Sequence, residues 1–156
     1  MNSDNFMRQA IEISIENVRS SMGGPFGAVI VRNGVVIATG ANSVTRTDDP
    51  TAHAEIVAIR NACKTLGTFQ LTGCTIYSSC EPCPMCLGAL YWARIEQIFF
   101  ANTRKQAAGI GFDDEFLYTE LIKSIEERSI PTYHVNTTHA YDAFALWERS
   151  NKKVEY

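Results

Sequence analysis

Apolar positions near the N-terminus recur at the spacing of an α-helix. Between about residues 5 and 21 they form one stripe with acidic and basic residues around it, a pattern that predicts an amphipathic helix. The stripe contains Phe6, Ala10, Ile13, Asn17 and Met22. The Gly-Gly-Pro segment at residues 23–25 is predicted to end this helix.

Two short apolar runs follow, FGAVIVR and VVIATGA, with Asn33 and Gly34 between them. Asn-Gly between two apolar runs is a strong β-hairpin signal, because a type I′ turn needs positive φ at both central residues. Both runs are nearly continuous in apolar residues. We therefore expect a sheet that is covered on both faces.

Helices and strands alternate through the rest of the chain. The segments TAHAEIVAIRNACKTLG and PMCLGALYWAR are interpreted as helices, and CTIYSS and IEQIFFA as strands. A further helix is expected within residues 111–128, an edge strand in PTYHVN (131–136), and a last helix over roughly 138–150. The helical face within 111–128 contains Phe112, Phe116, Leu117, Leu121 and Ile125. This alternation predicts a layered α/β domain with helices on both faces of the sheet.

The length of 156 residues fits a single domain, and 46% hydrophobic with 20% charged residues is ordinary for a globular protein. A formal net charge of −3 argues against a broad nucleic-acid-binding surface. The sequence has no apolar stretch of about 18 residues and no secretory signal, so we expect no membrane partner. Five cysteines without an export signal indicate a reducing, cytoplasmic location.

Three residues with metal-binding side chains stand out: His53, Cys83 and Cys86. The cysteines form a C-x-x-C pair at the start of a predicted helix, so both sulfur atoms can face one point. One His and two thiolates suit Zn²⁺, and three protein ligands are typical of a catalytic site whose fourth position stays open for water. Both ligand groups precede predicted helices, where the partial positive charge favours thiolates. We therefore predict one catalytic Zn²⁺ per chain.

Glu55 lies two residues after His53 and is the candidate proton carrier between water and substrate. The pattern His-x-Glu followed by Pro-Cys-x-x-Cys is the known signature of zinc nucleobase deaminases. The main alternative is a closed structural site in which Cys80 is the fourth ligand and zinc has no exchangeable water. Cys63 and Cys74 are interpreted as core residues.

The segments TAHAEIVAIRNAC and SSCEPCPMCLGALYWARI resemble the cytidine deaminase-like superfamily of CMP/dCMP-type zinc deaminases. The resemblance covers nearly the whole chain. It is nearer to the purine branch, which holds bacterial guanine deaminases and tRNA adenosine deaminases. It implies a three-layer α/β/α fold with a central mixed five-stranded sheet, and the five strands expected from the apolar pattern agree with it.

Within the purine branch, AAGIGFDDEFLYTELIKSIEERSIP resembles the short bacterial guanine deaminases. The tRNA enzymes typically keep a more basic C-terminal helix, and an RNA-binding version needs cationic surface. The implied activity is hydrolysis at C2 of guanine to xanthine and ammonia, with Glu55 passing a proton from water to N3. The alternatives are a tRNA adenosine deaminase (A to I editing), another small nucleobase or nucleoside deaminase, and a non-catalytic zinc module.

Candidate substrate contacts follow from this resemblance and from the donors and acceptors of guanine. Asn42 is expected to hydrogen-bond the base and Phe26 to form a wall of the pocket, with a turn residue and a core residue as the alternatives. Asp114 is the candidate carboxylate for the N1 and amine edge, with helix N-capping as the alternative. The backbone near Ala54 is a further candidate contact. Tyr156 belongs to the C-terminal segment that closes over the pocket in the resembling enzymes, in some of them from the partner subunit.

Residues 1–156 are expected to form one domain that assembles into a homodimer and acts on a small purine rather than on nucleic acid. The C-terminal segment, about 137–156, is the part expected to be exchanged with a partner subunit. A short predicted helix carries apolar residues that either meet the partner or fill the core. These are Ala89, Leu90, Tyr91 and Trp92.

Overall fold

The computed structural model describes residues 3–156 and divides into two compact units. Unit 1 extends to Asp114 and contains the sheet, and unit 2 is Glu115–Tyr156. None of the helices in the described residues is long and apolar enough to cross a lipid bilayer.

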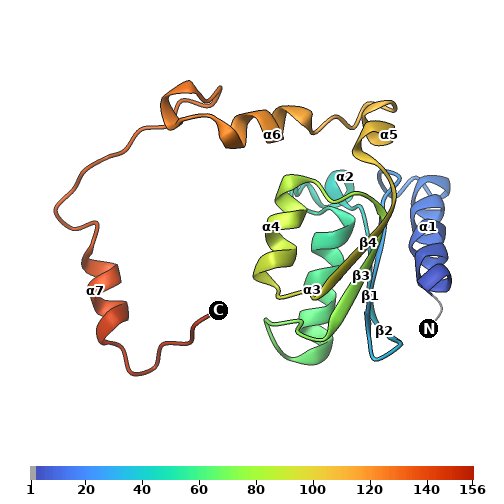
Figure 1. Cartoon of the computed structure of the whole chain (residues 1–156), viewed down its shortest axis with the longest axis horizontal. Helices are drawn as coiled ribbons and strands as arrows, with labels where there is room; N and C mark the ends of the chain where they lie inside the picture. Colours follow the sequence, from blue (N-terminus) through green and yellow to red (C-terminus); the bar gives the residue numbers. More distant parts are fainter. Residues whose placement is uncertain (1–2) are drawn as a thin grey trace. The chain divides into compact units, whose positions relative to one another are not determined.

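Unit 1 is built on a four-stranded mixed sheet (Figure 1). Its strands are β1 (Gly27–Arg32), β2 (Val35–Ala41), β3 (Cys74–Cys80) and β4 (Gln97–Asn102). The strand order is β2-β1-β3-β4, with β1 antiparallel to both β2 and β3, and β4 parallel to β3. The end of β2, the start of β1 and the ends of β3 and β4 therefore meet at one edge of the sheet.

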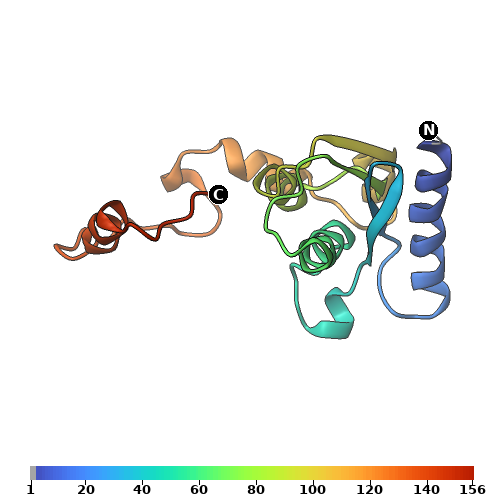
Figure 2. The same cartoon turned by 90° about the horizontal axis from the view of Figure 1, so that it is seen from below.

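Helices cover both faces of this sheet, as Figure 2 shows. The helices of unit 1 are α1 (Ser3–Arg19), α2 (Val44–Thr47), α3 (Ala54–Leu66), α4 (Pro84–Trp92) and α5 (Arg104–Ala108). α1 packs on one face, where Ala10 contributes to a core with Val29 and Tyr77. α3 and α4 pack on the other face, where Ala58 and Leu90 share a core with Ile76. The predicted α/β/α layering is confirmed for unit 1.

The hairpin between β1 and β2 forms at the predicted place. Asn33 has φ 52° and Gly34 has φ 77°, as the type I′ turn requires. The two helical layers then approach the hairpin closely at two other glycines. A Cβ on Gly27 would lie 2.4 Å from the Ala10 carbonyl oxygen of α1, and a Cβ on Gly40 would lie 2.2 Å from the Ala54 carbonyl oxygen of α3. Glycine at these positions lets the backbones of helix and strand touch.

The expectation of five strands is wrong, because the described residues form four. The segment PTYHVN has no regular secondary structure and no strand partner. Its alternating apolar residues favour a strand locally. However, Pro131 has no backbone N–H to donate, and a strand forms only where a neighbour is available to pair with it.

Unit 2 contains three short helical segments and no buried residue. They are α6 (Glu115–Ile122), the 3₁₀ turn η1 (Ile125–Glu127) and α7 (Asp142–Arg149). The predicted 111–128 helix is thus interrupted before Ser124, whose side chain forms a capping box with Glu127. Large apolar side chains such as Phe144 and Leu146 are more than half exposed. Unit 2 therefore has no hydrophobic core of its own.

Candidate active site

The candidate site lies where four chain segments leave the same edge of the sheet. Phe26 immediately precedes β1 and Asn42 immediately follows β2. The Glu-Pro-Cys segment at residues 81–83 follows β3, and Thr103 follows β4. Helices α3 and α4 also begin at this edge, so their first turns bring His53 and Cys83 together.

The three predicted metal ligands converge at these two helix starts. His53 is the N-cap of α3 and Cys83 is the N-cap of α4. Cys86 lies in the first turn of α4, two residues after Pro84. Pro fits this first helical position because the N–H that it lacks has no partner within the helix. His53 Nδ1 lies 3.6 Å from Cys83 Sγ and 3.5 Å from Cys86 Sγ.

These distances fit a tetrahedral zinc site. A zinc ion bonded to His nitrogen at about 2.0 Å and to Cys sulfur at about 2.3 Å places those two atoms about 3.5 Å apart. In the described residues, these three are the group of metal-binding side chains whose ligand atoms lie within 4.8 Å of one another. Cys80 does not belong to it: its Sγ lies 3.9 Å from the Thr103 carbonyl oxygen. The residues present therefore fit one three-ligand catalytic Zn²⁺ and not the closed alternative.

The two ligand thiols have opposite pKa shifts because they interact with each other. A hydrogen bond from Cys86 lowers the pKa of Cys83 to about 4, and His53 and the backbone N–H of Cys86 add to this effect. Donation to Cys83, burial and the nearby Glu55 raise the pKa of Cys86. The hydrogen bond with Cys83 raises the pKa of His53. These interactions favour the thiolate form of Cys83, and a bound cation would favour the thiolate form of both cysteines.

Glu55 lies beside this cluster and is 6% exposed. Burial raises the pKa of its carboxyl. Its Oε2 lies 3.5 Å from Cys86 Sγ, and its Oε1 accepts a hydrogen bond from Ser78 Oγ over 3.2 Å. A buried carboxyl with a raised pKa next to a metal centre is suited to receiving and returning a proton.

Asn42 is buried and its orientation is fixed by backbone groups. Its Oδ1 lies 3.4 Å from the backbone nitrogens of both Gly24 and Val44, and each donates to it. Its carbonyl oxygen accepts from Asn17 Nδ2 of α1 over 2.9 Å, and its own N–H donates to the Phe26 carbonyl over 3.1 Å. With the amide oxygen held in this way, the NH₂ group is the part of the side chain suited to donate to a ligand.

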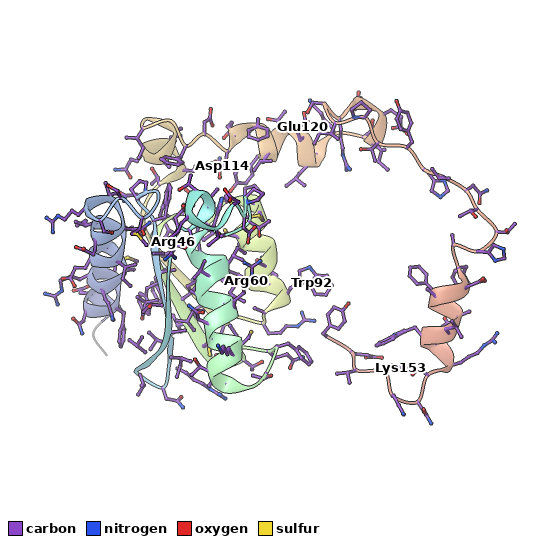
Figure 3. All side chains as sticks on the ribbon, turned by 180° about the vertical axis from the view of Figure 1, so that it is seen from behind. Arg46, Arg60, Trp92, Asp114, Glu120 and Lys153 are labelled. Atoms are coloured by element: carbon purple, nitrogen blue, oxygen red, sulfur yellow. The ribbon has the colours of Figure 1, made fainter. Side chains whose placement is uncertain are left out.

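Asp114 lies at the end of unit 1 that carries α2 and α5 (Figure 3), close enough to Cys83 and His53 to interact with both electrostatically. Burial and the charge of Cys83 raise its pKa, and its charge in turn acts on His53. Phe112, two residues earlier, packs edge-on against Phe26 with ring centroids 4.9 Å apart. This contact holds the loop that contains Asp114 against the residue preceding β1.

The remaining residues singled out in the sequence lie in the core, pack against it or are exposed. Ala54 is fully buried, so only its backbone is available to a ligand. Cys74 is fully buried in the core and Cys63 packs against that core, as predicted. Leu90 is a core residue, whereas Tyr91 is exposed. Trp92 and Tyr156 are also exposed, and Tyr156 belongs to unit 2.

Three supporting residues were missed by sequence reasoning. Asn17 was placed in the apolar stripe of the first helix, although it holds Asn42. Ser78 contacts Glu55, and Glu81 accepts from the Arg104 N–H over 3.0 Å, which joins the start of α5 to the cysteine motif. A polar residue within an apolar pattern was the available signal for Asn17 and Ser78.

The sequence matches the family described as cytidine and deoxycytidylate deaminase zinc-binding region over residues 1–102. It is 52% identical to guanine deaminase of Bacillus subtilis (strain 168) over 156 residues, which cover all of both chains. It is 46% identical to a tRNA-specific adenosine deaminase of Aquifex aeolicus over 86 residues, covering 55% of this chain and 57% of that protein.

The fold also matches solved structures of guanine deaminases. The fold matches the X-ray structure of guanine deaminase from Bacillus subtilis with a TM-score of 0.98, covering 100% of this chain and 99% of that chain at 52% identity. It matches guanine deaminase from Nitrosomonas europaea with a TM-score of 0.67 at 33% identity, covering 70% of this chain and 63% of that chain.

Proposed function

We propose how the residues of this chain carry out the deamination of guanine, the reaction that it catalyses. The chain belongs to the cytidine and deoxycytidylate deaminase zinc-binding family. The observation that carries the function is identity along the full length to a guanine deaminase, together with a matching fold. The acidic net charge of −3 agrees with a small-molecule substrate.

The reaction replaces the exocyclic amine at C2 of guanine by the oxygen of water, so that guanine and water give xanthine and ammonia. Zinc held by His53, Cys83 and Cys86 would act as a Lewis acid that lowers the pKa of the attacking water. Glu55 takes the proton of that water on its carboxylate and delivers it to N3 of the base. Its position beside the metal ligands supports this role, and the burial that raises the pKa of its carboxyl makes it a better proton acceptor than an exposed carboxylate.

The purine is proposed to bind between Asn42, Phe26 and Asp114. Asn42 donates its NH₂ group to an acceptor of the base, and Asp114 accepts from the N1 and amine edge. Phe26, held edge-on by Phe112, forms a wall against the ring. The backbone near Ala54 contacts the reacting centre. Support for this arrangement comes from the fixed amide of Asn42 and from the electrostatic effect of Asp114 on His53.

We propose a homodimer in which the segment of about 137–156 is exchanged and Tyr156 closes the partner's pocket. The support is that unit 2 exposes many large apolar side chains and has no buried residue. A segment of this size without a core is not stable alone and needs another surface to cover it. A cytoplasmic location is proposed because none of the five cysteines forms a disulfide.

A panel of substrates tests the function. Ammonia release is measured with guanine, guanosine, adenine, cytosine and cytidine, and zinc content is determined on the same sample. Guanine is expected to be turned over fastest. A tRNA substrate at low salt tests the alternative of A to I editing. Faster conversion of adenosine in tRNA than of guanine would contradict the assignment.

The role of Glu55 is tested by Glu55→Ala. Turnover of guanine is expected to fall by about 10²- to 10⁴-fold, because general acid–base catalysis is lost. Zinc content is expected to stay at the wild-type level, since Glu55 does not belong to the metal-binding group. Near-normal turnover by this variant would contradict the proposed proton transfer.

A further inference from the structure

β3 carries one hydroxyl on a face that is otherwise apolar. Side chains alternate along a strand, so Cys74, Ile76, Ser78 and Cys80 share the face covered by α3 and α4. Ser78 is 2% exposed. A buried hydroxyl costs free energy unless it is hydrogen-bonded, so its partner indicates why a serine occupies this position.

The partner of Ser78 is the carboxylate of Glu55. Ser78 Oγ donates to Glu55 Oε1 over 3.2 Å, and both side chains are buried. The other carboxylate oxygen, Oε2, lies 3.5 Å from Sγ of the metal ligand Cys86. The two oxygens therefore have different surroundings: Oε1 faces β3, and Oε2 faces the metal centre.

We propose that Ser78 is a positioning residue that holds Oε1 of Glu55 and thereby keeps Oε2 directed at the metal centre. The inference rests on the proposed role of Glu55 as the proton carrier. A Glu side chain has three rotatable bonds. A hydrogen-bond donor on β3, an inner strand of the sheet, selects one of its conformations. Precise placement matters, because a displacement of about 1 Å costs on the order of 100-fold in rate.

Steady-state kinetics of guanine hydrolysis test this proposal. They compare the zinc-loaded, full-length wild-type protein with the variants S78A, S78T, S79A and E55Q. S78A is expected to lower kcat by about 10- to 100-fold, the loss of one hydrogen bond to a charged group. Its KM and zinc content are expected to remain within about twofold of the wild-type values, because neither substrate binding nor the metal ligands change. S78T keeps the hydroxyl and is expected to recover most of kcat.

Ser79 provides a matched control on the same strand. It is 1% exposed, faces α1, and its Oγ accepts from the Gly27 N–H over 3.0 Å. S79A also removes a buried hydroxyl, and it leaves a backbone N–H without that acceptor. It is therefore expected to lower the thermal unfolding temperature while kcat stays at the wild-type value.

The outcomes distinguish the positioning role of Ser78 from the proton-transfer role of Glu55. Wild-type kcat in S78A together with an inactive E55Q would overturn the inference about Ser78 and leave the role of Glu55 intact. An equal loss of kcat in S79A, or an S78T enzyme no faster than S78A, would also overturn it, since the effect would not depend on this hydroxyl. Wild-type turnover by E55Q would overturn the proposed role of Glu55, and the Ser78 inference with it.

Discussion

Asn42 is held by hydrogen bonds that reach it from other parts of the chain. The helix residue Asn17 supports its carbonyl oxygen, and the backbone N–H of Gly24 supports its side-chain oxygen. The side-chain oxygen also accepts from the Val44 N–H, so the side-chain amide cannot rotate without breaking both of these bonds. A preorganised amide of this kind binds a base at a lower entropic cost than a mobile one.

Asp114→Asn tests the carboxylate proposed to read the guanine edge. The substitution replaces an acceptor oxygen by an NH₂ group, which cannot accept from the N1–H or the amine. kcat/KM for guanine is expected to fall by about 10- to 100-fold, the value of a hydrogen bond to a charged group. Steady-state kinetics with guanine measure this change.

Asp113→Asn is the matched control for that substitution, because it removes the same charge one residue earlier in the sequence. Its kcat/KM is expected to stay near the wild-type value. A larger loss in Asp113→Asn than in Asp114→Asn would reverse the assignment of the two carboxylates.

Residues whose role depends on local chain geometry were predictable from the sequence. His53, Cys83 and Cys86 act through their spacing and through the helices that they begin, and both signals are contained in short segments. The role of Ser78 was not predictable, because it depends on β3 lying beneath the first turn of α3. That placement results from packing between segments that are far apart in the sequence.

The same distinction applies to the secondary structure. The Asn33-Gly34 turn was predicted because its two positive φ angles are a local requirement. The antiparallel neighbours β1 and β3 are separated in the sequence by β2, α2 and α3, and no local pattern specifies their pairing. The short helices α2 and α5 were missed, since four or five residues do not show a helical period.

α3 approaches the sheet so closely because Gly40 has no side chain. A Cβ there would lie 2.2 Å from the Ala54 carbonyl oxygen and 2.5 Å from the Ala58 backbone nitrogen. These are backbone atoms, so the whole helix must move to accept a larger residue. Since His53 is the N-cap of α3, such a movement would also displace a metal ligand.

Gly40→Ala is therefore expected to lower the free energy of unfolding by about 1–3 kcal/mol or more, the usual effect of overpacking. Its zinc content after purification is expected to fall as well. Chemical denaturation and metal analysis measure the two effects.

Gly88→Ala in α4 is the control, because a Cβ there would meet no atom of another element within 4 Å in the described residues. Alanine in a helix interior is expected to stabilise by roughly 0.5–1 kcal/mol. Equal stability of the Gly40 and Gly88 variants would contradict the close contact between α3 and β2.

Across the whole molecule, the two units differ in how their apolar residues are covered. Unit 1 has a core on each face of its sheet, whereas unit 2 leaves its large apolar residues exposed. The stability of unit 1 is thus expected to be intrinsic, and that of unit 2 to depend on assembly.

A chain ending at residue 136 tests the proposed exchange of the C-terminal segment. We expect the full chain to sediment as a dimer and the shortened chain as a monomer that retains zinc, because all three ligands lie in unit 1. Sedimentation velocity and metal analysis give these values. A shortened chain that remains dimeric would contradict the exchange.

Removal of zinc by a chelator is expected to lower the thermal unfolding temperature of the full chain. A ligand that binds only the folded state at about 1,000 times its Kd stabilises by about 4 kcal/mol, which corresponds to roughly 10 °C for a chain of this length. Calorimetry before and after chelation measures the shift. An unchanged unfolding temperature would show that the metal does not link α3 to α4.

The low pKa of Cys83 has a consequence for the chemical durability of the protein. The hydrogen bond from Cys86 and the neighbouring His53 favour the thiolate form of Cys83, and the sulfur of Cys86 lies within 4.8 Å of the other ligand atoms. A thiolate beside a second thiol in a C-x-x-C pair is readily oxidised to a disulfide. Zinc therefore protects the pair from oxidation, and an enzyme that loses its metal in air would need a reductant before it could bind zinc again.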